Sequence, residues 1–121
     1  MSFYGLAEAS RAIQAKGRAV LVEGSVDVHR LRALGIHNAV APTLALLRGD
    51  VDASALRAYT DRAIILFDGD GAGAKAAKVV AAACANVGIV ATISLVPVGV
   101  RDPEKFVLTA PQEDVERIFG A

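Results

Sequence analysis

Two short apolar runs each end in carboxylates and glycine, and this repeated pattern limits the folds that the chain can adopt. The first run, Val20-Leu21-Val22, is followed by Glu23-Gly24 and then by Asp27; the second, residues 64–67, is followed by Asp68-Gly69-Asp70. A short apolar run that stops at such residues is typical of a buried strand. Strands that are apolar on both faces favour a parallel sheet covered by helices on each side.

The four carboxylates that follow these strands predict a cation site. Ligands of open parallel sheets bind beyond the carboxyl ends of the strands, and both acidic segments fall there. Withdrawing carboxylates from water costs on the order of several kcal/mol per ion unless positive charge compensates them. A hard divalent cation, Mg²⁺ or Mn²⁺, is the expected partner of oxygen ligands. The alternatives are that Glu23 is solvated, that Asp27 only favours a helix N-terminus, and that residues 68–73 form a solvated, flexible turn.

The rest of the chain alternates between helical and strand patterns, which predicts an α/β protein. The expected fold is a compact, mostly parallel four-stranded sheet flanked by helices, in a single domain that spans residues 1–121. Ser25 is expected to cap the second helix. Strands are predicted at 19–22, 38–41, 63–67 and 89–96, and helices at 6–15, 25–34, 44–47, 53–59, 72–85, 104–108 and 112–119.

Charge and cysteine content narrow the possible partners and compartment. Lys plus Arg equals Asp plus Glu at 13 each, so the chain lacks the basic excess of domains that hold nucleic acid alone. Such a partner would have to be held by a local patch, by metal or by other domains. Cys84 is the only cysteine, which excludes an internal disulfide and fits the cytoplasm. Residues 79–100 carry no charge, but Gly88 and Pro97 interrupt them, so a helix followed by a strand is expected rather than a membrane span.

Glycines after the second acidic segment suggest contacts with phosphate. Gly69, Gly71 and Gly73 let the backbone turn and expose N–H groups at the start of a helix. Lys75 is a candidate to face the same anion, and the alternative is that it is solvated. The spacing is that of neither a Walker A loop nor a dinucleotide fingerprint. An EF-hand is excluded because Val79 stands where its bidentate glutamate is required.

A third acidic pair, Asp102 and Glu104, follows the last predicted strand. In a parallel sheet this loop also returns to the carboxyl edge, so both residues are candidates to complete the cation site. The alternative is an ordinary charged loop that caps a short helix.

Three segments together resemble the TOPRIM domain, and specifically its version in bacterial DnaG-type primases. They are Val22-Glu23-Gly24-x-x-Asp27-Val28, Phe67-Asp68-Gly69-Asp70-x-Ala72-Gly73 and Asp102-Pro103-x-x-Phe106, in the family's order and spacing. The opening Tyr4-Gly5-Leu6-x-Glu8-Ala9 resembles the segment that precedes TOPRIM in those primases. A strand followed by Asp-x-Asp-Gly also resembles haloacid-dehalogenase-type phosphatases, but those carry the motif on their first strand.

The resemblance implies an activity, a set of site residues and a set of partners. Glu23 would act as general acid or base in phosphodiester transfer, Asp27, Asp68 and Asp70 would bind magnesium, and Asp102 and Glu104 match the later acidic pair. Gly24, Gly69, Gly71, Gly73 and Lys75 would face the nucleotide phosphates. The implied partners are nucleoside triphosphates, a single-stranded DNA template or RNA–DNA hybrid, other primase domains and the replicative helicase. A small TOPRIM nuclease and a non-catalytic binding module remain the alternatives, and the chain is expected to be a catalytic core that is incomplete alone.

Overall fold

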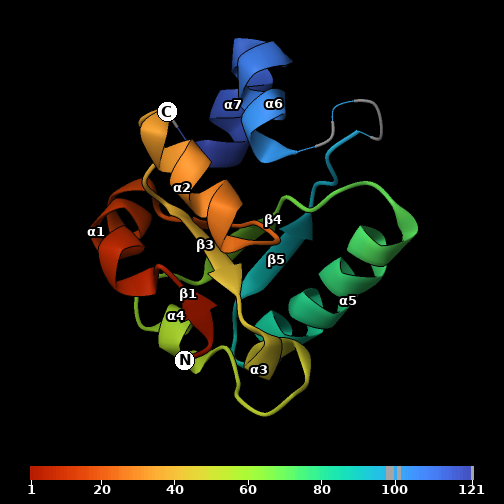
Figure 1. Ribbon diagram of the computed structural model, residues 1–121. Coiled ribbons are helices and arrows are strands. Elements are labelled where there is room, and N and C mark those ends of the chain that lie inside the picture. Colours follow the sequence, from red (N-terminus) through yellow and green to blue (C-terminus); the bar gives the residue numbers. More distant parts are fainter. Residues whose placement is uncertain (98–99, 101, 121) are drawn as a thin grey trace.

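A parallel sheet forms the centre of the molecule in the computed structural model, which describes residues 1–97, 100 and 102–120. Within these residues the sheet has five strands in the order β1-β3-β2-β4-β5 (Figure 1). All neighbouring strands are parallel except β1, which runs antiparallel to β3. The strands are β1 (Phe3–Tyr4), β2 (Ala19–Leu21), β3 (Ala39–Pro42), β4 (Arg62–Ile65) and β5 (Val90–Ile93).

Helices cover both faces of this sheet. One face packs against α1 (Leu6–Lys16), α3 (Leu44–Leu47), α4 (Ser54–Arg57) and α5 (Gly71–Asn86). The opposite face packs against α2 (Ser25–Ala33), α6 (Pro103–Thr109) and α7 (Gln112–Phe119), which lie together in Figure 1.

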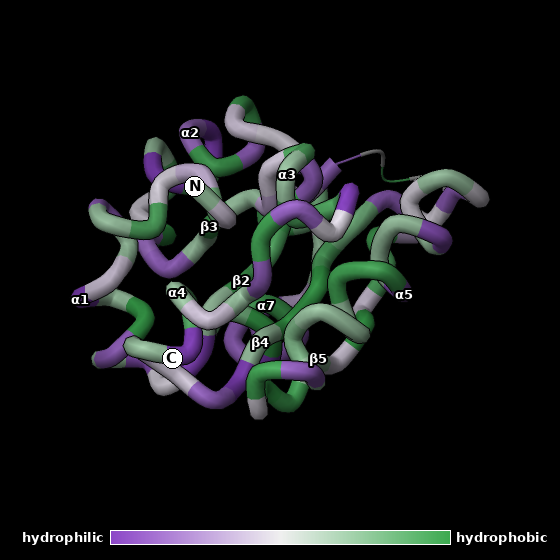
Figure 2. Tube along the Cα trace, turned by 90° about the horizontal axis from the view of Figure 1, so that it is seen from below, coloured by the Kyte–Doolittle hydropathy of each residue, from purple (hydrophilic) through white to green (hydrophobic). Residues whose placement is uncertain are grey.

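Alternation along the strands produces two separate cores. In β2, Leu21 belongs to the core beneath α1 and α5, whereas Val20 and the next residue, Val22, belong to the core beneath α2, α6 and α7. All three side chains are fully buried, which the period of two in a strand requires when both faces are covered. Figure 2 shows hydrophobic strand segments towards the middle of the molecule.

The predicted fold class is confirmed, with one strand more than expected. The pair Phe3 and Tyr4 forms the additional strand β1, which is too short to show a periodic pattern. Gly24, not Ser25, is the N-cap of α2, and Ser25 is its first helical residue. The last strand is also shorter than predicted: β5 ends at Ile93, and Val96 then forms an isolated parallel bridge with Asp68, in the segment that follows β4.

The uncharged stretch near residues 79–97 divides between the second half of α5 and β5. Across the described part of the chain, every helix is too short or too polar to cross a bilayer.

Candidate active site

The two acidic segments meet at the carboxyl edge of the sheet. Strands β2 and β4 are parallel neighbours that pair Leu21 with Ile65. Beyond each strand, the backbone continues through buried residues to a carboxylate, which is Glu23 after β2 and Asp68 after β4. Register therefore explains why residues 45 positions apart in the sequence become neighbours.

A short hydrogen bond joins these two segments directly. The backbone N–H of Asp68 donates to Glu23 Oε1 at 2.6 Å. Burial is the largest influence on the Glu23 carboxyl and raises its pKa; the hydrogen bond from Asp68 opposes this, and repulsion from Asp68, Asp70 and Asp27 adds to it. Glu23 is consequently held in position by Asp68 while the surrounding charges disfavour its ionised form.

Asp27 and Asp68 experience the same surplus of negative charge. Burial raises the pKa of Asp27, and so does repulsion from Asp102 and Asp68, against a lowering hydrogen bond from Gly24 and the charge of Arg30. Burial likewise raises the pKa of Asp68, together with repulsion from Asp70 and Asp102. Five of the six predicted carboxylates therefore act electrostatically on at least one other: Glu23, Asp27, Asp68, Asp70 and Asp102.

Asp70 and Asp102 each cap a helix. Asp70 Oδ1 accepts a hydrogen bond from the N–H of Gly73 at 2.6 Å and begins α5. Asp102 Oδ1 accepts one from the N–H of Lys105 at 2.8 Å and begins α6. In each case one carboxylate oxygen satisfies a helix N-terminus, and the second oxygen is left for another partner.

Gly73 allows α5 to approach the acidic segments closely. A Cβ atom at this position would overlap the carbonyl oxygen of Asp68 and lie 3.0 Å from Glu23 Oε1. The N–H of Gly73 is already bonded to Asp70, so this predicted phosphate donor is engaged within the chain. The other predicted phosphate-facing residues do not contribute to this close approach: Gly24 caps α2, Gly69 lies in the turn, Gly71 starts α5 and Lys75 is exposed on α5.

Arg30 is a residue of this edge that the sequence reasoning missed. It follows Asp27 by three positions on α2, and its guanidinium lies 3.8 Å from Asp102 Oδ2 and 3.9 Å from Glu104 Oε1. It provides the positive charge that links α2 to α6. The helical spacing of Asp27 and Arg30 was a usable signal, since residues three apart share a helix face.

The carboxylates at this edge have the chemistry of a site for a hard divalent cation such as Mg²⁺. Their oxygens are the ligands that this ion prefers, and their raised pKa values indicate negative charge that lacks compensation. Among the described residues, however, no three acidic, histidine or cysteine side chains converge as a preformed cage. Mg²⁺ commonly keeps several waters and binds through one or two carboxylates plus phosphate oxygens, which is compatible with this arrangement.

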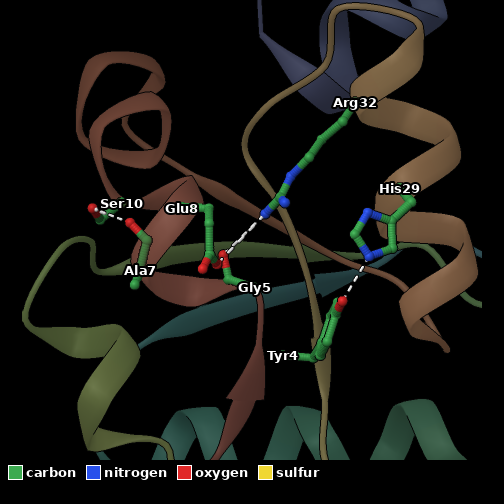
Figure 3. Close-up of polar contacts among 7 residues, drawn as sticks. All are labelled: Tyr4, Gly5, Ala7, Glu8, Ser10, His29 and Arg32. Atoms are coloured by element: carbon green, nitrogen blue, oxygen red, sulfur yellow. Dashed lines mark hydrogen bonds and ion pairs between the residues drawn. The ribbon is translucent and has the colours of Figure 1, made fainter.

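A cavity elsewhere in the described part of the chain contains none of the predicted site residues. It measures about 740 Å³ and is bounded by β1, the start of α1, α2 and α4. Two polar contacts beside it fix α2 (Figure 3): Tyr4 Oη and His29 Nε2 lie 2.6 Å apart, and Arg32 donates to the carbonyl of Gly5 at 3.2 Å. These contacts secure the helix that carries Asp27.

The sequence matches the Toprim domain family over residues 17–93, which include β2 to β5 and the first two acidic segments. The DNA primase of Aquifex aeolicus is 35% identical over 120 residues, 99% of this chain but 24% of that protein. A crystal structure of the zinc-binding and RNA polymerase domains of Aquifex aeolicus primase superposes with a TM-score of 0.78, at 34% identity over 95% of this chain and 28% of the other. The DnaG primase catalytic domain bound to single-stranded DNA gives a TM-score of 0.74, at 30% identity over 95% of this chain and 37% of the other.

This chain spans about a quarter of the length of the curated primase that it matches. The family match covers more than half of the chain and includes the strands that deliver Glu23 and Asp68. The protein belongs to the Toprim domain family.

Proposed function

We propose that this chain, residues 1–121 as a single domain, is the metal-dependent nucleotidyl-transfer core of a DnaG-type primase. The observation that carries the proposal is the junction of Glu23 with Asp68, beside the carboxylates of Asp27 and Asp70, at the carboxyl edge of the sheet. The similarity of this chain to DNA primases over nearly the whole of its length supports the same function.

The site residues divide between cation binding and proton transfer in this proposal. Asp27, Asp68 and Asp70 hold Mg²⁺ or Mn²⁺, and Asp102 and Glu104 supply further oxygens. The bound cation orients the nucleotide and neutralises charge on its phosphates. Glu23 accepts the proton of the attacking hydroxyl, a role that suits a carboxyl whose pKa is raised by burial.

The glycines at the starts of α2 and α5 face the nucleoside triphosphate in this proposal. A Cβ atom at Gly24 would lie 3.9 Å from Asp27 Oδ2 and one at Gly71 would meet nothing within 4 Å, so both glycines keep the approach to the carboxylates open. Gly69 and Lys75 would contact phosphate. Gly73 contributes to the site by letting α5 pack close to Asp68 and Glu23, because its N–H group is already bonded to Asp70.

The zero net charge means that this chain lacks the basic excess of a domain that holds nucleic acid alone, which favours a template held with the help of other domains. We expect a single-stranded DNA template or RNA–DNA hybrid to be gripped by other primase domains, with the replicative helicase as a further partner. Primer synthesis would take place in the cytoplasm. A nuclease and a non-catalytic module are less favoured because the relatives named above are primases.

A titration of Mn²⁺ tests the cation site directly. The wild-type chain and Asp68→Asn/Asp70→Asn are titrated with Mn²⁺, with and without ATP, by calorimetry. Asp50→Asn/Asp61→Asn is the matched control, since both residues are exposed and lie outside the three acidic segments; Asp61 precedes β4, at the opposite end of that strand from Asp68. We expect binding by the wild type and the control but not by the site variant; equal binding by all three would refute the site.

A chimaera tests the activity. This chain replaces the matching quarter of the Aquifex aeolicus primase, and primer synthesis is measured on single-stranded DNA. Primer synthesis that disappears on Glu23→Gln supports the proposal. Cleavage of the template without synthesis would identify a nuclease instead.

A further inference from the structure

Arg30 lies among three of the predicted cation ligands. Its guanidinium contacts Asp102 and Glu104 on α6, and its charge also acts on Asp27 one turn earlier on α2. Helix α2 packs against α6 (Figure 1). The ion pairs of Arg30 therefore bridge the two helices that carry these carboxylates. No other basic side chain of the described residues forms an ion pair with a predicted ligand.

Both contacts of Arg30 are weak enough to be exchanged. At 3.8 and 3.9 Å they are ion pairs rather than hydrogen bonds, and the Arg30 side chain is 49% exposed. Exposed ion pairs of this kind contribute little to stability. The guanidinium is therefore held near the carboxylates mainly by charge, and it has room to turn towards solvent.

Arg30 and a divalent cation would compete for the same atom. Asp102 Oδ1 is occupied by the N–H of Lys105, which fixes the carboxylate at the start of α6. The remaining oxygen, Oδ2, is the one that faces Arg30. A cation that uses Asp102 must therefore displace the guanidinium or tolerate its positive charge nearby.

We propose that Arg30 is the resident counter-ion of this acidic site, and that it exchanges Asp102 and Glu104 for a nucleotide phosphate when a divalent cation arrives. The guanidinium fork suits phosphate oxygens, to which it donates in bidentate fashion. Before the cation binds, Arg30 offsets repulsion at the edge; afterwards it adds a positive contact to the substrate. The inference rests on the proposed metal-dependent function and assigns a substrate-binding residue to it.

The exchange predicts effects of opposite sign in a single variant. Arg30→Gln should bind Mn²⁺ alone about two- to fivefold more tightly, because a competing positive charge is lost. The same variant should bind the Mn²⁺–ATP complex more weakly than the wild type. Raising the salt concentration to about 1 M should shrink both differences, because exposed charges are then screened.

Two further variants separate this role from a structural one. Arg30→Lys keeps the charge and should bind Mn²⁺ alone like the wild type, but it should recover only part of the Mn²⁺–ATP affinity. Arg11→Gln removes the same charge from an exposed position on α1 and should change neither affinity. Mn²⁺ affinity is measured by electron paramagnetic resonance, and thermal unfolding confirms that each variant is folded.

The outcomes distinguish failure of the Arg30 proposal from failure of the proposed metal-dependent function. If Arg30→Gln binds Mn²⁺ as the wild type does, or more weakly, Arg30 does not compete with the cation and the inference is wrong. If Mn²⁺–ATP affinity does not fall in Arg30→Gln, the phosphate role is wrong. If the wild type binds Mn²⁺ neither alone nor with ATP, the proposed metal site fails and the inference fails with it.

Discussion

Glu23 Oε1 accepts a hydrogen bond of 2.6 Å from the backbone N–H of Asp68. This contact joins the ends of β2 and β4 through a side chain whose own ionisation the site disfavours. The Glu23 carboxylate thus has a structural role, as the acceptor for Asp68, and an electrostatic role, as a charge repelled by three aspartates. The two roles are separable because an amide oxygen accepts the same hydrogen bond without carrying the charge.

Glu23→Gln should preserve the fold and abolish chemistry. The glutamine carbonyl can still accept from Asp68, so the free energy of unfolding without metal should stay equal to that of the wild type or rise. Loss of a general base typically costs about 10²- to 10⁴-fold in rate, and primer synthesis by the chimaera should fall by that amount. Urea unfolding and primer extension measure the two effects. Wild-type primer synthesis in this variant would remove Glu23 from the proposed mechanism.

The metal-free chain should become less stable as pH rises through the carboxyl range. The pKa values of Glu23, Asp27 and Asp68 are raised in the folded state, so at intermediate pH the folded chain binds more protons than the unfolded chain. Their unfavourable contribution is absent well below the ordinary carboxyl pKa, near 4, and is complete above the raised values.

Urea unfolding from about pH 4 to about pH 7 in the absence of metal tests this slope. Asp27→Asn/Asp68→Asn should flatten it, because two of the three raised groups are gone. Saturating Mg²⁺ should also flatten it in the wild type by compensating the charge. A slope that is identical in the wild type and the double variant would show that these carboxylates do not set the pH dependence.

The sequence predicted the parallel sheet because its strands are apolar on both faces. Strand β4 and the acidic residues after it carry their signal locally, in a run of large apolar residues that ends at Asp68. Strand β1 carries no such signal: it is two residues long and exists only because Phe3 and Tyr4 meet Pro42 and Ala41. Pairing partners of this kind are set by tertiary contacts, which a local pattern does not contain.

The site residues also divide into those whose placement follows from a local pattern and those whose contacts depend on tertiary structure. Glu23 and Asp68 were placed together because register in a parallel sheet brings strand ends to one edge. Asp70 and Asp102 were predicted as ligands, and their capping bonds depend on where α5 and α6 begin. Arg30 was missed because its two partners lie on α6, more than 70 positions later in the sequence.

Cys84 should resist thiol reagents until the chain unfolds. It is fully buried on α5, and burial raises the pKa of its thiol to about 11, so little thiolate is present at pH 8. We expect labelling by Ellman's reagent at a rate that tracks global unfolding, with fast reaction only in urea. Rapid labelling of the native chain would show that α5 separates readily from the sheet.

Gly73→Ala and Gly71→Ala form a matched pair that tests how closely α5 approaches the carboxylates. A methyl group at Gly73 would overlap the Asp68 carbonyl and approach Glu23, whereas a methyl group at Gly71 would meet nothing within 4 Å. We therefore expect Gly73→Ala to lose about 1–3 kcal/mol of unfolding free energy through overpacking. Gly71→Ala should be neutral or gain up to about 1 kcal/mol, since alanine favours the helix.

Mn²⁺ affinity should differ between the two glycine variants in the same direction as stability. Displacing Asp68 or Glu23 alters the oxygens offered to the cation, so Gly73→Ala should also weaken Mn²⁺ binding, while Gly71→Ala should leave it unchanged. Urea unfolding and Mn²⁺ titration on both variants provide the comparison. Equal stability and equal Mn²⁺ affinity in the two variants would mean that α5 does not press on the Glu23–Asp68 junction, and that the glycine at position 73 is not what allows the carboxylates to gather at this edge.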